Sequence, residues 1–318
     1  MTANRILYIG APEADAAAFE ALARAAFPGL DLVATNDREA ARGHAGEAVA
    51  MIGHHFQFDE ALVEAAPKLR WIQSLTTGTD AIVKLRALRP EVVVTSTRGM
   101  HGPQMSELVF LHMLSLTRDL PKILRHQQRR HWERWPQPLL WGKTAVIVGV
   151  GAISEALAPR CKAFGMKVVG VSGTPRAAEG FDAMYTRDRL AEAAALADYL
   201  VLVVPLSKET ENLVDARVLA AMKPGAFVVN VARGGVLDEQ ALVAALREKR
   251  LAGAALDVFR EQPLPAASGL WSEPRVLITP LLGGMSDIYL EQAWPIVREN
   301  LAGFLAGDTG AMHNVVRR

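Results

Sequence analysis

The stretch TAVIVGVGAIS, residues 144 to 154, decides how this chain folds. Its apolar, β-branched first half predicts a strand, which runs directly into two closely spaced glycines. Gly149 permits a tight turn, and Gly151 removes a side chain that would keep a phosphate from the backbone amides of Ala152 and Ile153. A strand, a glycine turn and a helix in this order are the start of a dinucleotide-binding Rossmann unit.

Two positions of this unit depart from the usual pattern. Ser154 stands where a third glycine is expected, although serine is small enough for close packing of the helix on the strand. The next strand ends at Ser172, where an NAD site usually places an acid against the ribose hydroxyls. Ser172, Thr174 and Arg176 offer hydroxyls and a cation instead. We therefore expect NADP or NAD as the cofactor, with NADP favoured, although Arg176 could also be a solvated loop residue.

On both sides of this unit, short β-branched runs alternate with Ala- and Leu-rich helical stretches, a pattern typical of parallel sheets. Five predicted strands precede the glycine turn and resemble a small flavodoxin-like sheet: residues 5–10, 31–36, 48–54, 70–74 and 92–96. Six predicted strands form the Rossmann sheet: residues 144–149, 167–172, 199–204, 226–232, 253–258 and 275–280.

The two series predict two α/β domains. Residues 103–141 look like a helical crossover followed by an arm, and residues 287–306 carry apolar side chains at three- and four-residue steps. We expect that last helix to return to the first domain. The prediction is a doubly wound Rossmann domain, residues 103–284, inserted into a smaller flavodoxin-like domain of residues 1–102 plus 285–318.

Composition excludes several other classes of function. The 318 residues include 35 Lys and Arg against 34 Asp and Glu, which leaves no charge surplus to attract nucleic acid or an anionic membrane. A nucleic-acid role has little behind it except the basic stretch at residues 125–135, whose Trp residues could stack on bases. A single cysteine, Cys161, excludes an intrachain disulfide. We expect a cytoplasmic protein with a small-molecule substrate, no membrane partner, no nucleic acid and no metal.

Several segments, spread in order from residue 70 to residue 286, carry a resemblance to one family. The longest is NVARGGVLDEQALVAALREKRLAGAALDVF, residues 230–259, and others are RWIQSLTTGTD, residues 70–80, and the Pro-Leu-Pro of residues 263–265. The chain resembles the D-isomer-specific 2-hydroxyacid dehydrogenases. The resemblance implies transfer of a hydride between NAD(P) and a small 2-oxo or 2-hydroxy acid bound in a cleft between the domains.

The resemblance also implies roles for individual residues. Arg233 would bind the substrate carboxylate and carbonyl, for which a planar, permanently charged guanidinium is well suited. Thr77 and Gly78 match the family's substrate-carboxylate loop. The remaining matched positions would line the cofactor: Pro205, Thr210, Val231, Ala232 and Asp257. Asp257 would face the nicotinamide, or else cap the loop that follows its strand.

Two matched positions lack the family's catalytic groups. The family protonates the keto oxygen with a histidine that a glutamate keeps protonated, but here these positions hold Leu281 and Gln262. Glu261 lies one place early, and the intact Pro-Leu-Pro favours Gln262 as the equivalent. The two changes are consistent with each other. Without its histidine partner a glutamate would be an unpaired charge in the cleft, and an uncharged amide costs less free energy there.

The leading hypothesis is an oxidoreductase with an atypical site, whose proton comes from water or another side chain. His54, His55 and His101 are possible replacements, although structural roles suit each of them better. The alternative is a dinucleotide-binding sensor without turnover. The apolar, Trp-rich segment of residues 103–141 further predicts a homodimer.

Overall fold

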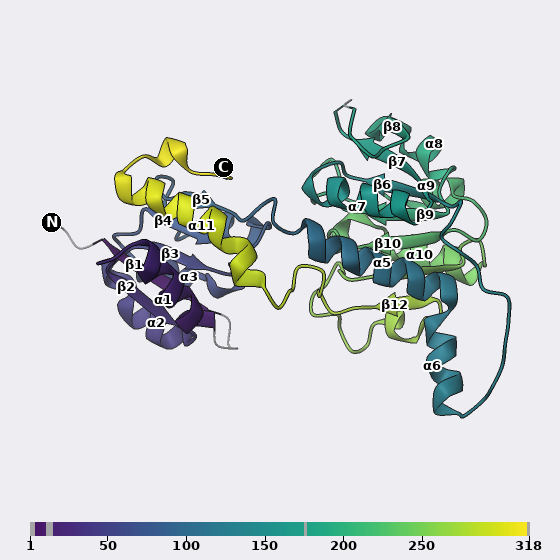
Figure 1. Ribbon diagram of the computed structural model, residues 1–318, viewed down its shortest axis with the longest axis horizontal. Helices are drawn as coiled ribbons and strands as arrows, with labels where there is room; N and C mark the ends of the chain where they lie inside the picture. The colour runs from purple at the N-terminus through teal and green to yellow at the C-terminus, as the bar shows by residue number, and fades with distance from the viewer. Residues whose placement is uncertain (1–3, 11–14, 175–176, 317–318) are drawn as a thin grey trace. The chain divides into compact units, whose positions relative to one another are not determined.

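The computed structural model describes residues 4–10, 15–174 and 177–316. The chain divides into two compact units, residues 1–100 with 286–318 and residues 101–285. These bounds lie within two residues of the domain bounds predicted above. Figure 1 shows a separate parallel sheet in each unit.

The smaller unit holds five parallel strands in the order β2-β1-β3-β4-β5, which is the flavodoxin order. The strands are β1 (Arg5–Ile9), β2 (Leu32–Thr35), β3 (Ala48–Gly53), β4 (Trp71–Ser74) and β5 (Val93–Thr95). The helices are α1 (Asp15–Ala26), α2 (Arg38–His44), α3 (Glu60–Glu64), α4 (Asp80–Val83) and α11 (Tyr289–Ala306), with short 3₁₀ turns η1 (Ala45–Glu47), η2 (His55–Gln57) and η6 (Thr309–Ala311).

Helices cover both faces of this sheet. Alternate strand residues such as Ile6 and Tyr8 pack with α1 and α11, and Leu7 and Ile9 pack on the opposite face with α2 and α3. Because α11 buries Val297 and Leu301 in the first of these clusters, the last helix belongs to the core that the N-terminal strands build. The smaller unit is therefore discontinuous in sequence.

The larger unit holds seven parallel strands in the order β12-β11-β10-β9-β6-β7-β8. The strands are β6 (Thr144–Val148), β7 (Lys167–Ser172), β8 (Ala183–Thr186), β9 (Tyr199–Leu202), β10 (Phe227–Asn230), β11 (Gly253–Leu256) and β12 (Val276–Ile278). From β8 to β11 this is the Rossmann order, with β12 added beyond it. Six of these strands are at the predicted positions. The seventh, β8, was not predicted, because AMYT is short and carries no run of β-branched residues.

The helices of the larger unit also form two layers. α5 (Gly102–Arg118) and α7 (Ala152–Ala163) pack on one face, and α8 (Leu190–Ala194), α9 (Ala216–Ala221) and α10 (Glu239–Arg247) pack on the other. α6 (Leu120–Gln128) extends from the end of α5 (Figure 1). The 3₁₀ turns are η3 (Arg187–Arg189), η4 (Gly234–Val236) and η5 (Gly269–Ser272). Among the helices described, none is long and apolar enough to cross a membrane.

Cys161 lies in α7 and is fully buried. Burial raises the pKa of its thiol to about 12, so the thiolate is not formed near neutral pH. The side chain therefore acts as a small core residue.

Candidate functional site

The glycine turn after β6 has the geometry that its sequence predicts. Gly149 has φ +105°, and a Cβ built on it would lie 2.8 Å from the backbone nitrogen of Val204, so no other residue fits there. A Cβ built on Gly151 would meet nothing within 4 Å, which leaves open space in front of the first turn of α7. The free N–H groups of a helix start are suited to a pyrophosphate.

Ser154 replaces the third glycine without loss of this geometry. Its side chain is fully buried, and its Oγ accepts a hydrogen bond from Gly151 N at 2.8 Å and donates to Gly151 O at 2.9 Å. The helix begins at Ala152, so Ser154 closes the first turn from within the helix. The residues present therefore fit a bound dinucleotide.

A cation that was not predicted, Arg187, lies near the end of β7. Ser172 Oγ accepts a hydrogen bond from Thr174 N at 3.4 Å. Next to it, a Cβ built on Gly173 would lie 2.6 Å from Nη2 of Arg187, so this guanidinium lies against the Gly173 backbone. Arg176, the cation expected here, lies outside the described residues. Sequence reasoning missed Arg187 because it follows β8, the strand that was not predicted.

The loop from Pro205 to Thr210 is closed by its own side chains. Thr210 is buried, and its hydroxyl donates to Pro205 O at 2.7 Å and accepts from Ser207 N at 2.7 Å. Thr210 thus shapes the loop on which Pro205 is exposed.

The segment that follows β10 fixes the backbone of Arg233. Asn230 is buried, and its side chain accepts from Ala232 N at 3.0 Å and donates to Arg233 O at 3.2 Å. A Cβ built on Gly234 would lie 1.9 Å from the carbonyl carbon of Phe259, so the glycine is required for this close approach. Val231 and Ala232 are buried, whereas the Arg233 side chain is half-buried and donates from Nη1 to Ala232 O at 2.8 Å.

Asp257, at the end of β11, holds the loop that follows β12. Its carboxylate is buried and accepts three hydrogen bonds, from Thr279 Oγ1 at 2.6 Å, Leu282 N at 2.8 Å and Gly283 N at 2.9 Å. Both carboxylate oxygens are therefore engaged by this loop, which we call the Thr279–Gly283 loop.

A buried histidine continues this network. His112, on α5, lies 3.1 Å through its Nε2 from Thr279 Oγ1. Because the Thr279 hydroxyl donates to Asp257, His112 Nε2 must carry the proton that it donates to Thr279. Burial lowers the pKa of His112 to about 4, and the nearby Asp257 charge opposes that shift only in part. His112 is thus neutral at pH 7, and no sequence motif points to its role.

The two positions that the resemblance matches to the family's catalytic pair, Leu281 and Gln262, carry no acid. Leu281 belongs to the Thr279–Gly283 loop, is half exposed at 50% and has φ +58°. Gln262 is exposed and precedes Pro263 in a cis peptide bond. Neither the leucine nor the amide can supply a proton near neutral pH.

In the smaller unit, the loop after β4 carries Thr77 and Gly78. Thr76 Oγ1 donates to Gly78 O at 2.9 Å, lies 2.9 Å from Ser74 Oγ and lies 3.1 Å from His55 Nδ1. Tyr289 of α11 donates to Leu75 O at 2.5 Å. The loop is therefore held by hydrogen bonds from both sides, with Thr77 exposed at its tip.

Of the three histidines considered as alternative acids, none is exposed. His54 is buried between Phe56 and Tyr289, and its ring centroid lies 5.3 and 5.2 Å from theirs. His55 supports the Thr76 loop, and His101 is buried at the start of α5. These contacts are structural in kind.

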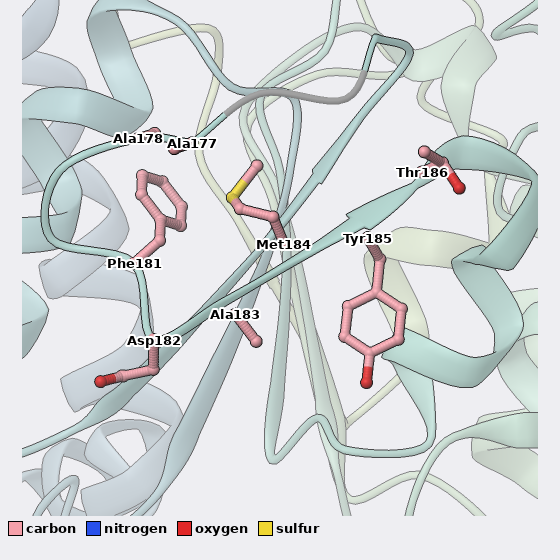
Figure 2. Close-up of a pocket in the computed structure, with 8 residues that line it drawn as sticks. All are labelled: Ala177, Ala178, Phe181, Asp182, Ala183, Met184, Tyr185 and Thr186. Atoms are coloured by element: carbon pink, nitrogen blue, oxygen red, sulfur yellow. The ribbon is translucent and has the colours of Figure 1, made fainter.

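Two other features of the larger unit lie away from the predicted residues. A hollow flanks the edge strand β8, where Met184 and Tyr185 project to opposite sides of the strand (Figure 2). On α6 and the segment after it, His126 Nε2 and His131 Nε2 lie 3.5 and 3.7 Å from Glu133 Oε2, a spacing compatible with a shared metal ion. Lys122 already binds the other oxygen of Glu133 at 3.2 Å, so this group forms an ion-pair cluster.

Comparison with known proteins agrees with the fold and with the motifs. Residues 110–283 match the model of the D-isomer specific 2-hydroxyacid dehydrogenase NAD binding domain. The glyoxylate reductase of Thermococcus litoralis is 35% identical over 264 residues, 79% of this chain and 78% of that protein.

Solved structures give the same result over almost the whole chain. A D-isomer specific 2-hydroxyacid dehydrogenase family protein from Aeromonas salmonicida has a TM-score of 0.91 and 36% identity, with 99% of each chain covered. An NADPH-dependent glyoxylate/hydroxypyruvate reductase from Sinorhizobium meliloti, solved with NADP and sulfate, has a TM-score of 0.83 and 26% identity, with 98% of each chain covered. The chain belongs to the D-isomer specific 2-hydroxyacid dehydrogenases, and it is an oxidoreductase that uses NAD or NADP.

Proposed function

We propose that this protein reduces a small 2-oxo acid of the glyoxylate or hydroxypyruvate type with NADPH, and that it does so without a protonated histidine beside the substrate. The observation that carries the proposal is the Leu281 position, which lies in an ordered loop but bears no acid. Relatives of this chain include a glyoxylate reductase and an NADPH-dependent glyoxylate/hydroxypyruvate reductase.

Each matched residue has a role in this proposal. Arg233 binds the substrate carboxylate and polarises its carbonyl, since a guanidinium stays charged and donates two parallel hydrogen bonds. Thr77 and Gly78 contribute backbone groups to the same carboxylate. The cofactor, when bound, supplies the hydride. Gly149, Gly151, Ala152 and Ile153 receive its pyrophosphate, while Pro205, Val231 and Ala232 line its path.

The proton is the step for which this chain differs from its family. A positioned general acid contributes about 10² to 10⁴ in rate. With Leu281 and Gln262 in place of the histidine and glutamate, the proton must come from water. Hydride transfer then proceeds more slowly, and cofactor and carboxylate binding are unaffected.

A sensor without turnover is the second candidate, and the same two substitutions favour it. Isothermal titration with NADPH and NADH, followed by a turnover screen over a panel of 2-oxo acids with both reduced cofactors, separates the two. Slow but saturable turnover supports the reductase. Tight dinucleotide binding without turnover on any acid supports the sensor. NADH binding at least tenfold tighter than NADPH would contradict the proposed cofactor preference.

We also propose that the protein is a cytoplasmic homodimer. Large apolar side chains of α6 and the following segment are exposed, with Trp132 at 90% and Trp141 at 74%. Trp135 is instead half-buried beneath Lys122, whose Nζ lies 4.1 Å from the ring centroid. Exposed apolar surface of this extent is typical of an interface. A monomeric mass by light scattering in dilute solution would contradict the dimer.

A further inference from the structure

We propose that Arg187, in the 3₁₀ turn η3 after β8, is the residue that binds the 2′-phosphate of NADPH. This inference rests on the proposed use of NADPH and names the side chain that would select it. Arg187 lies after β8 and not in the glycine-rich sequence motif that follows β6, so its assignment depends on the three-dimensional structure.

The first argument is position. In a Rossmann unit the adenosine ribose binds at the carboxyl end of the second strand, which here is β7. Ser172, the last residue of β7, pairs with Thr186 of β8 in the parallel register. Arg187 follows Thr186 directly, so the register places it beside Gly173. Figure 2 shows the end of β8 at Thr186.

The second argument is contact. A Cβ built on Gly173 would lie 2.6 Å from Nη2 and 3.2 Å from Cζ of Arg187. The guanidinium therefore packs on the bare backbone of Gly173, and its side chain is half-buried. A side chain at position 173 would therefore move the Arg187 guanidinium away from its present place.

The third argument is chemistry. A guanidinium is always charged, and its planar fork matches a phosphate. Ser172 Oγ accepts from Thr174 N, which leaves its own proton available for a phosphate oxygen. The position that would carry a repelling carboxylate in an NAD site is Ser172 itself. One cation and one hydroxyl therefore flank the place of the 2′-phosphate.

The neighbouring charges leave Arg187 suited to this role and Arg189 unsuited to it. The Arg187 charge contributes to lowering the pKa of Glu209, although a hydrogen bond from Ser207 is the largest cause. Arg189 is instead engaged by Glu192, through hydrogen bonds of 3.1 and 2.6 Å, and it lies over the Tyr185 ring. Arg189 is therefore a matched control on the same turn.

The test is isothermal titration of the full-length protein with NADPH and with NADH. For Arg187→Ala we expect the Kd for NADPH to rise at least tenfold, which corresponds to about 1.4 kcal/mol, while the Kd for NADH changes less than twofold. Arg189→Ala should leave both constants unchanged. For Arg187→Lys the Kd for NADPH should lie between those of the parent and the alanine variant, since a lysine keeps the charge but not the planar fork of the guanidinium.

A second variant tests the contact without removing the charge. Gly173→Val keeps Arg187 but fills the space that its guanidinium occupies. It should therefore also raise the Kd for NADPH more than the Kd for NADH. If Arg187→Ala weakened both dinucleotides equally, or neither, the inference would be overturned while the proposed function stood. If the parent protein bound neither dinucleotide, the proposed function and this inference would fail together.

Discussion

The glycine turn at residues 149–154 and the Thr279–Gly283 loop hold their backbones in different ways. In the turn, Ser154 replaces a glycine, yet two hydrogen bonds to Gly151 preserve the backbone geometry that a pyrophosphate needs. In the loop, Asp257 holds the backbone through three hydrogen bonds, and in the proposed function Leu281 stands where the family has its acid. We propose that the first region keeps its function through a new side chain, and that the second keeps its shape without the family's proton donor.

This difference teaches that cofactor binding and proton delivery depend on separable parts of the larger unit. Backbone N–H groups bind a phosphate, so their geometry matters and most side chains are tolerated. A proton donor is a single side chain, so one substitution removes it while leaving its loop in place. The following variants break or sharpen this comparison, from the largest expected effect to the smallest.

Arg233→Ala should give the largest loss, because it removes a charged clamp that neither region can replace. A bidentate pair of charge-assisted hydrogen bonds is worth about 3 to 6 kcal/mol, so kcat/KM for a 2-oxo acid should fall by about 10² to 10⁴. Steady-state kinetics measures this fall, with Arg247→Ala, an exposed arginine on α10, as the control. A loss below tenfold would show that Arg233 does not bind the substrate.

Asp257→Asn should destabilise the Thr279–Gly283 loop. Leu282 N bonds one carboxylate oxygen and Gly283 N bonds the other, so the NH2 group of the amide must face one of these two N–H groups, and hydrogen bonds to a charged group are worth about 1.5 to 3 kcal/mol each. We expect a loss of about 3 kcal/mol in the free energy of unfolding, measured in urea. Cofactor binding at the glycine turn should be retained. If NADPH binding were lost from a folded variant, the two regions would not be separable.

His112 predicts how stability depends on pH. Its pKa is about 4 when folded and near 6.5 when unfolded, so the unfolded chain takes up the proton first as the pH falls. Stability is fully retained above pH 6.5 and is lost progressively down through pH 4. Between pH 7 and pH 5 the loss should be about 2 kcal/mol. His112→Gln should flatten this part of the curve; an unchanged slope would assign it to other groups.

Leu281→Gly should have the smallest effect. Leu281 has φ +58°, a conformation that costs a side chain about 1 kcal/mol relative to glycine. We expect a gain in stability of up to about 1 kcal/mol, offset in part by the greater entropy of the unfolded chain. Urea denaturation measures it. A clear loss would mean that the exposed leucine makes a contact of its own.

Most of the fold followed from the sequence, because periodicity and glycine placement are local signals. Eleven strands were predicted near their observed positions, and β8 was missed for want of β-branched residues. The return of α11 to the smaller unit followed from its apolar spacing.

The candidate site residues were predictable from the sequence only where they belong to a recognisable motif. Gly149, Gly151 and Arg233 belong to such motifs. Arg187, His112 and Thr279 act through neighbours that are distant in the chain, such as the 167 residues that separate His112 from Thr279. No local sequence pattern predicts such a contact, and the predicted cation Arg176 lies outside the described residues.

The central claim is that proton delivery, and not binding, limits this enzyme. It is tested most directly by single-turnover stopped-flow oxidation of NADPH with glyoxylate or hydroxypyruvate, in the parent and in Leu281→His with Gln262→Glu. Leu281→Asn is the matched control, because asparagine also accepts positive φ but supplies no acid near neutral pH. We predict that the double variant oxidises NADPH at least tenfold faster than the parent, since a fully positioned acid contributes about 10² to 10⁴ in rate. Leu281→His alone should gain less. A double variant no faster than the parent, with NADPH binding unchanged, would contradict the claim and favour a sensor without turnover.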